Sequence, residues 1–287
     1  MNQLRRCAST APLATFFALT YSWSWLWWIP TVLTYRGSVW GRPIGALIIP
    51  IIAGAYGPTI SAIAVTALGE GGPGLRALLR KYLDWRVNWR WYLAALATPG
   101  LAALVAIWWF TRRGGSVRTF EAAGLLQIPA ALIGALPFGP LAEELGWRGF
   151  ALPRLVRRHS LIAATLILGT AWTLWHAPLY WAPAGTSISG QYPSVLDVAT
   201  YLFEVVGMAF LFTWIGRHTR WNVPMALLLH AALNGSFAFL LFSAFSSAEG
   251  GVLSRQMIAW SAVPIWILVL AIIGIEGRAW IRRDPDQ

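Results

Sequence analysis

Eight runs of about 20 mostly apolar residues, the length that a helix needs to cross a bilayer, follow one another along this chain of 287 residues. The chain is 57% hydrophobic and only 11% charged, against roughly 25% charged residues in a soluble domain. A helix satisfies its own backbone hydrogen bonds inside a bilayer. We therefore expect an all-α fold, a polytopic membrane helical bundle with about eight transmembrane helices. The expected spans are residues 11–33, 44–68, 90–110, 122–142, 161–182, 197–216, 222–245 and 257–275.

The net charge of +11 also fits a membrane protein. The basic residues fall in short clusters between the apolar runs, as they do in loops at an anionic membrane surface. They form no stripe along one face, so we expect the lipid bilayer as a partner and no nucleic acid. Cys7 is the one cysteine, and the chain can therefore form neither an internal disulfide nor a Cys-based zinc site.

The chain is expected to be one integral-membrane domain over residues 1–287, with its motifs in about 122–245. The links between runs reach only about 20 residues, which is too short for a separate soluble domain. The first run ends in the aromatic cluster Trp23–Trp28 and lacks the small-residue cleavage site of a signal peptide, so we expect it to remain as a span.

The distribution of Lys and Arg predicts the orientation. Eight spans place both termini on one side, and the links on that side carry fifteen basic residues against six on the other. By the positive-inside rule, we expect a multi-pass protein of the cell membrane with both termini in the cytoplasm. Two stretches, 75–91 and 152–159, alternate basic and apolar residues and are expected to be interfacial helices.

Charged residues inside apolar runs are functional-site candidates, because placing them in a bilayer is costly. Glu143 and Glu144 follow the fourth run, with Arg148 four residues after Glu144. On a helix, positions four apart lie about 40° apart in azimuth, so Glu144 and Arg148 can pair. Glu143 points about 100° away from Glu144 and is free to face a cavity as a general base. The alternative is an ordinary helix end at the interface, with its charges in water.

Two further pairs lie on later runs. Trp172 and His176 are four residues apart in the fifth run, and His230 and Asn234 have the same spacing in the seventh. Each pair therefore projects from one face of a helix. The alternative is that these side chains only hydrogen-bond one helix to the next. Glu204, in the sixth run, has no role that we can assign.

A carboxylate, two imidazoles and an amide supply what hydrolysis of an amide by water requires. The chain has no HExxH, GxSxG or Walker motif. In straight helices Glu143, His176 and His230 would lie at different depths. Convergence requires either that the fourth run continue past Glu144 or that the fifth run begin later. We expect a long fourth run that bends at Pro137–Pro140 and continues past Glu144.

These motifs resemble those of the CAAX prenyl-protease and bacteriocin-processing family of intramembrane proteases, also called the abortive-infection family. Its first motif is two Glu, three residues and Arg, which matches Glu143 to Arg148. Its second is an aromatic residue four before His, here Trp172 and His176, where the family usually has Phe. Its third is His four before Asn, here His230 and Asn234.

The resemblance implies an intramembrane endopeptidase of the metalloprotease type that acts on a membrane-embedded peptide or protein. Glu143 would activate water, and Asn234 would stabilise the oxyanion. His176 and His230 would position the water or bind a metal such as zinc. Glu144, Arg148 and Trp172 would hold these groups in place.

Two other functions remain open. A proton-coupled carrier could use Glu143, His176, Glu204 and His230 as a relay, although no inverted repeat is visible. An immunity or scaffolding factor could keep the motifs without catalysis, but it would most readily have lost Glu143 or a histidine.

Overall fold

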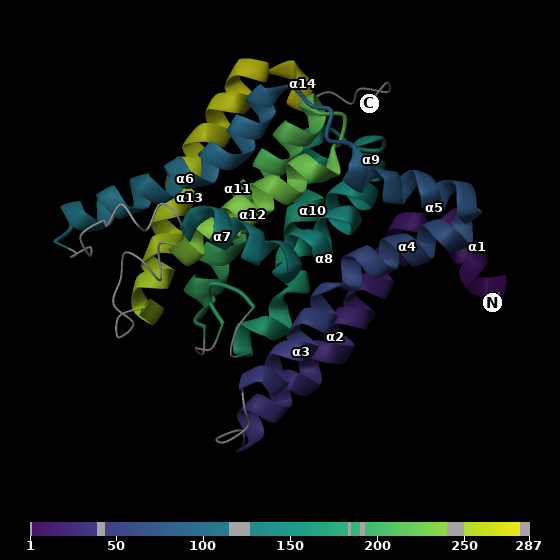
Figure 1. The fold of residues 1–287 in the computed structure, drawn as a ribbon, viewed down its shortest axis with the longest axis horizontal. Helices are drawn as coiled ribbons and strands as arrows, with labels where there is room; N and C mark the ends of the chain where they lie inside the picture. Colours follow the sequence, from purple (N-terminus) through teal and green to yellow (C-terminus); the bar gives the residue numbers. More distant parts are fainter. Residues whose placement is uncertain are drawn as a thin grey trace.

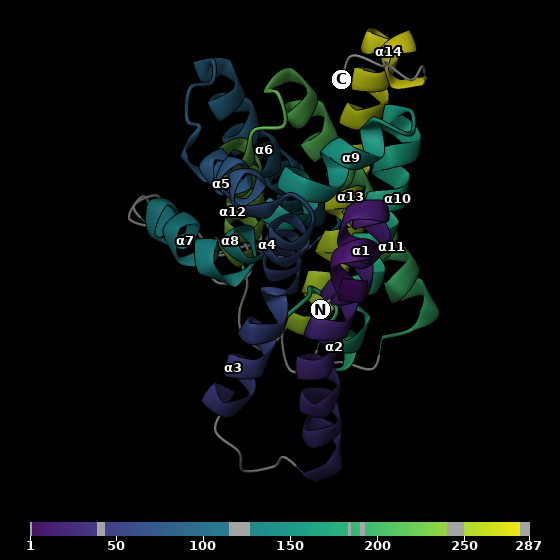
Figure 2. The ribbon, with the colours of Figure 1, turned by 90° about the vertical axis from the view of Figure 1, so that its right-hand side faces the viewer.

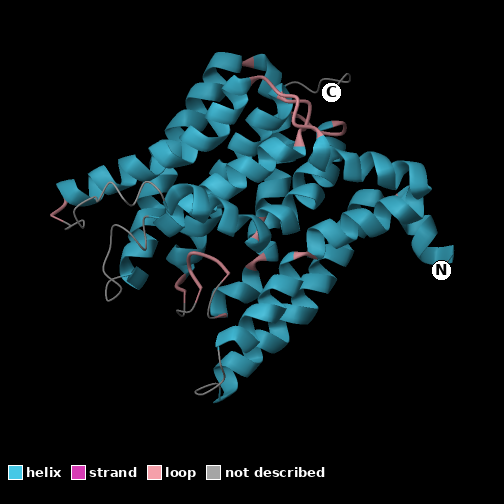
Figure 3. Cartoon of the chain, viewed as in Figure 1, coloured by secondary structure: helices cyan, strands magenta, loops and turns pink. Residues whose placement is uncertain are grey.

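The computed structural model describes residues 2–38, 44–114, 127–182, 185–189, 193–239 and 250–281. The regular elements in these ranges are helices, which confirms the all-α prediction (Figure 1 and Figure 3). In chain order they are α1 (Asn2–Thr10), α2 (Pro12–Ser38), α3 (Ile44–Ala55), α4 (Gly57–Gly69), α5 (Gly71–Arg80), η1 (Lys81–Leu83), α6 (Trp89–Arg112), α7 (Gln127–Ala135), η3 (Leu136–Phe138), α8 (Pro140–Glu144), η4 (Leu145–Ala151), α9 (Leu152–Val156), α10 (Leu161–Trp175), η5 (Ala177–Trp181), α11 (Val195–His218), α12 (Val223–Phe239), α13 (Gly250–Glu276) and α14 (Arg278–Ile281).

The helices form a membrane bundle. Among the described residues, three helices are long and apolar enough to cross a bilayer: Ile48–Gly69, Trp89–Arg112 and Val195–His218. Shorter apolar helices lie at Pro129–Phe138, Leu161–Trp175, Val223–Gly235 and Ser261–Glu276. All of these helices fall on predicted runs. Residues 122–126 and 240–245 of those runs lie outside the described ranges.

The bundle has two parts that meet at α8 and η4. α2 packs along α3 and α4, and the far ends of α2 and α3 project together beyond the other helices (Figure 1 and Figure 2). In the second part, α10 packs on α11, α11 on α13, and α12 on α6. The α8 and η4 segments contact both α4 and α12. The carboxylates of the first motif therefore lie where the two parts join.

The fourth run bends where its sequence predicts a bend. α7 ends at Ala135, the turn η3 follows, and α8 begins at Pro140. Pro is well suited to a first helical turn because it has no N–H that would need a partner there. The chain then continues past Glu144 as a π-helix, η4, whose residues are all buried. π-Helical turns are rare and are frequent at functional sites.

The fifth run differs from the prediction, because its helix ends at Trp175 rather than at residue 182. Pro178 cannot donate a backbone hydrogen bond to Leu174, and its ring excludes a continuing helix. The chain turns instead into the short helix η5. His176 thus sits at the end of α10, not in the middle of a long helix.

Side chains satisfy the carbonyl groups at this buried helix end. The Tyr21 hydroxyl donates to the Ala171 carbonyl at 2.6 Å, and the Trp25 indole donates to the Trp175 carbonyl at 3.0 Å. The Trp175 carbonyl has no partner within α10, and unsatisfied backbone groups at membrane depth are costly, so the bond from Trp25 helps α10 to end inside the bundle.

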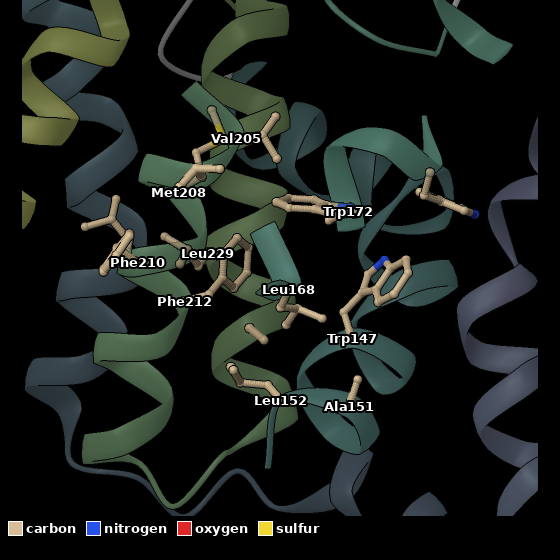
Figure 4. Packing of buried hydrophobic residues seen from close by; sticks show 14 of the residues in the cluster. Trp147, Ala151, Leu152, Leu168, Trp172, Val205, Met208, Phe210, Phe212 and Leu229 are labelled. Carbon is tan, nitrogen blue, oxygen red and sulfur yellow. The ribbon is translucent and has the colours of Figure 1, made fainter. Parts of the chain in front are cut away.

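Several large side chains lie inside the bundle, and Trp28, Trp147 and Trp175 are fully buried. Figure 4 shows Trp147 and Trp172 within the hydrophobic core. The stretch 152–159 was expected at the interface, yet Leu152, Leu155 and Val156 are buried and only its end, 157–159, is exposed. These side chains fill space between helices. The sequence did not predict this, because hydropathy alone does not distinguish lipid from a protein neighbour.

Gly146 allows η4 to lie directly against α4. A Cβ atom at this position would lie 2.6 Å from the Pro58 Cβ and would also clash with the Pro58 carbonyl group. We expect Gly146→Ala to lower the free energy of unfolding by about 1–3 kcal/mol, as overpacking does. Thermal unfolding in detergent measures this loss. Gly100→Ala in α6 is the matched control, because no atom lies within 4 Å of its added Cβ. An equal effect of both substitutions would contradict the close-contact explanation.

Candidate active site

The carboxylate of Glu144 joins two helical segments inside the bundle. Its Oε1 atom accepts hydrogen bonds from Arg148 Nη1 at 2.8 Å and from His230 Nδ1 at 2.7 Å. Glu144 is fully buried, and the side chains of its two partners, Arg148 and His230, are only 4% and 6% exposed. The predicted pair of Glu144 and Arg148 is therefore present, and His230 is an additional partner. Because a carboxylate accepts, His230 carries its proton on Nδ1 and leaves a lone pair on Nε2.

Arg148 is also held by aromatic rings. Its guanidinium carbon lies 4.0 Å from the ring centroid of Trp172 and 3.8 Å from that of Phe212. Such cation–π contacts stabilise a cation most where water is excluded. The arginine thus connects η4 to α10 and α11.

Glu143 has a different environment from Glu144. Its Oε2 atom accepts a hydrogen bond from Trp172 Nε1 at 2.7 Å, and the residue is 4% exposed. Among the described residues, no cationic side chain lies within salt-bridge distance of Glu143. The helical azimuths predict this separation of the two carboxylates. Trp172 does more than fill space, because its indole N–H makes a hydrogen bond to Glu143 that phenylalanine cannot make.

His176 lies at the C-terminal end of α10, where its Nδ1 atom donates to the Trp172 carbonyl at 2.8 Å. A carbonyl only accepts, so the Nε2 atom of His176 also keeps a lone pair. The imidazole is 7% exposed and lies among aromatic rings, 4.6 Å from Trp175 and 6.1 Å from Tyr201 between ring centroids. Tyr201 is a neighbour that no motif indicated.

His230 and Asn234 converge at Gly139, as their spacing predicts. A Cβ atom at Gly139 would lie 3.1 Å from His230 Nε2 and 3.1 Å from Asn234 Nδ2. Both polar atoms therefore approach the backbone of the broken fourth run. The signal for Gly139 was its place between Pro137 and Pro140, where helix breakers expose backbone to a neighbouring group.

Trp172 brings the cluster together. Its Nε1 bonds Glu143, while its ring lies 5.9 Å from His176 and 5.6 Å from His230 between centroids. Residues predicted from three separate runs are thus neighbours around one indole ring. Glu204 is not among them: it is buried on α11, where it accepts a hydrogen bond from Ser261 Oγ of α13 at 3.4 Å.

The described residues do not form a three-ligand metal site. Catalytic zinc takes three protein ligands and a water. His176 and His230 each present an Nε2 lone pair, but no group of three His, Cys, Asp or Glu side chains in the described ranges could hold a metal ion. We therefore derive no step through a metal, and zinc on His176 and His230 stays a prediction.

A residue outside the motifs also makes a hydrogen bond to η4. Lys81, the one lysine of the chain, donates from Nζ to the Gly149 carbonyl at 2.6 Å. Burial, together with the guanidinium groups of Arg154 and Arg157, lowers the pKa of Lys81 to about 8. Its place in a basic link gave the sequence no signal for this contact.

The fold and the cluster define a polytopic helical membrane protein with a buried centre of carboxylates, imidazoles and an amide. Residues 124–236 match the family described as Type II CAAX prenyl endopeptidase Rce1-like. This segment is similar to the Rce1-like family, and the resemblance inferred from the motifs is confirmed. All of the predicted site residues lie within it.

A curated relative agrees with the family match. The protein "CAAX prenyl protease 2" of Methanococcus maripaludis is 29% identical over 124 residues. The alignment covers 42% of this chain and 46% of that protein, so the chain spans about half the length of the relative.

The buried pair predicts that two Glu→Gln variants differ strongly in their free energy of unfolding. Glu144→Gln leaves Arg148 without its counter-charge, and losing one partner of a buried pair costs about 3–5 kcal/mol. Glu70→Gln is the matched control, because Glu70 pairs with Arg154 but is 50% exposed. Exposed pairs contribute only about 0–1 kcal/mol. Thermal or denaturant unfolding in detergent compares the two variants. Equal losses would show that Glu144 is not the central contact.

Proposed function

We propose that the chain is an intramembrane endopeptidase that uses Glu143 to activate water against a peptide bond. The observation that carries this proposal is the cluster of Glu143, His176 and His230 around Trp172, drawn from α8, α10 and α12. Asn234 lies beside His230 at Gly139. A single polar residue in a span is common, whereas four groups suited to one reaction rarely meet by chance.

The carboxylate of Glu143 serves as the general base. Trp172 Nε1 holds its Oε2, so the carboxylate keeps one orientation toward the reacting water. Glu143 takes a proton as the water oxygen bonds to the peptide carbonyl carbon. The same proton then passes to the amide nitrogen as the carbon–nitrogen bond breaks, which leaves a carboxylic acid and an amine.

The other polar groups act on the water and on the developing charge. The Nε2 lone pairs of His176 and His230 accept hydrogen bonds, so the imidazoles orient the attacking water. The Asn234 amide donates, so it stabilises the oxyanion of the tetrahedral intermediate. Glu144 and Arg148 are positioning residues, because Glu144 fixes the proton of His230 on Nδ1.

The proposed substrate is a peptide or protein in or on the bilayer. The name of the archaeal relative refers to prenylated CAAX proteins, and a lipid-anchored chain is one form that such a substrate can take. Water and the substrate must both reach a centre whose carboxylate and imidazoles, those of Glu143, His176 and His230, are less than a tenth exposed. Binding therefore includes separation of neighbouring helices.

The activity is tested by replacing the base. Glu143→Gln keeps the shape of the side chain but cannot take a proton, so we expect kcat/KM to fall by about 10²–10⁴-fold. Glu204→Gln is the matched control, because it is an equally buried carboxylate on α11 outside the cluster. The assay follows cleavage of tagged membrane peptides by purified protein in detergent. Equal cleavage by Glu143→Gln and wild type would exclude this base. Substrate flux into liposomes without cleavage would favour a carrier.

We also propose that the protein lies in the cell membrane with both termini in the cytoplasm, from the excess of fifteen basic residues over six on that side. A green fluorescent protein fused to either end should fluoresce, and a periplasm-dependent alkaline phosphatase at either end should be inactive. A fusion before the basic-free link 183–196 should give the opposite result. Phosphatase activity at either terminus would overturn the orientation.

A further inference from the structure

A small cavity of about 10 Å³, room for about one water molecule, lies between η4, α11 and α12. Its lining is mostly apolar and includes Leu152, Phe212 and Leu229, which are labelled in Figure 4. Arg148 is the charged residue of its wall, and the link between α11 and α12 forms its outer end through Trp221 and Asn222. The cavity thus extends from the end of a helix pair to the arginine of the first motif.

Arg148 has donors that no described protein group satisfies. Its Nη1 atom bonds Glu144, but Nε and Nη2 are buried without a hydrogen-bond partner among the described residues. Leaving buried donors of a charged group unpaired is costly, so they find a ligand where there is room for one. The arginine charge is already matched by Glu144 at 2.8 Å, which favours a neutral acceptor over an anion. The acceptor that is small, neutral and abundant is water.

The link that forms the outer end has an unusual backbone. Arg220 and Trp221 both have positive φ values, 56° and 58°, which non-glycine residues adopt rarely. This conformation returns the Trp221 N–H to the Gly216 carbonyl at 2.7 Å. It also lays the indole on Gly216, where an added Cβ would lie 2.8 Å from the Trp221 Cε3 atom. Asn222 is occupied by the Asp84 carbonyl and the Met225 N–H, so it does not compete for a ligand.

We propose that this cavity binds water on Arg148 and admits it from the α11–α12 link toward the polar centre. Arg148 donates a hydrogen bond to Glu144, and Glu144 also accepts one from His230. Water bound to Arg148 would therefore be connected to both residues through hydrogen bonds. The use of this water in hydrolysis rests on the proposed function, but its presence does not. A solvent site on the arginine would give the buried pair its missing hydrogen bonds whether or not the protein is a protease.

Hydroxyl-radical footprinting tests the water directly. An X-ray pulse forms the radicals from water in place, so a side chain is oxidised where water lies beside it. Phe212 lines the cavity and is 2% exposed, while Phe16 is 0% exposed and packs against Trp147 and Phe150. We expect wild-type Phe212 to be oxidised faster than Phe16 by more than an order of magnitude. Equal rates for the two phenylalanines would mean that the cavity is dry and would overturn the proposal.

A second variant locates the water in this cavity. Ala226 lines it and is 6% exposed, so Ala226→Leu should fill it and reduce Phe212 oxidation to the rate of Phe16. Ala77→Leu, at an exposed position of α5, makes the same substitution without filling the cavity and should leave the rate unchanged. Continued oxidation of Phe212 in folded Ala226→Leu would place the water elsewhere and overturn the assignment. The measurement needs no substrate, so its failure is separate from failure of the protease assay.

Discussion

The hydrogen bonds from Arg148 and His230 to the single oxygen Oε1 of Glu144 are the contacts on which the rest of the site depends. Removing charges from water is costly, and attraction between them compensates only when the geometry is good. Here one carboxylate fixes the π-helix η4 to α12, and the arginine continues the connection to Trp172 and Phe212. The same contact determines which nitrogen of His230 keeps a lone pair. Glu144 therefore both stabilises the fold and orients His230 for the proposed reaction.

Adjacent glutamates could have competed for the same partner, but helical geometry separates them. Glu144 faces Arg148, while Glu143 turns to the indole N–H of Trp172. A neutral donor holds a carboxylate in place without adding a full positive charge beside it, so the carboxylate remains able to take a proton. The tryptophan at this motif position thus orients the carboxylate that we propose as the base, in addition to filling space.

The sequence predicted the all-α fold, the bend at Pro137–Pro140 and the pairing of Glu144 with Arg148, because each depends on local spacing. It did not predict the end of α10 at Trp175, because the apolar run continues through Pro178 and hydropathy does not register a missing N–H. It also missed the hydrogen bond from His230 to Glu144, which joins residues 86 positions apart. The contact of Lys81 with the Gly149 carbonyl was equally out of reach, since it depends on how distant helices pack.

The broken helices explain how the polar groups reach one depth. In a straight helix through residue 182, His176 would be one more side chain on a helix wall, and its Nδ1 would have no special carbonyl to bond. Because α10 ends beside it, His176 bonds the Trp172 carbonyl through Nδ1 and keeps the lone pair of Nε2. Among the carbonyls that this break frees, that of Trp175 accepts a hydrogen bond from Trp25 of α2. The first span therefore contributes no reactive group, yet it allows the helix end that presents one.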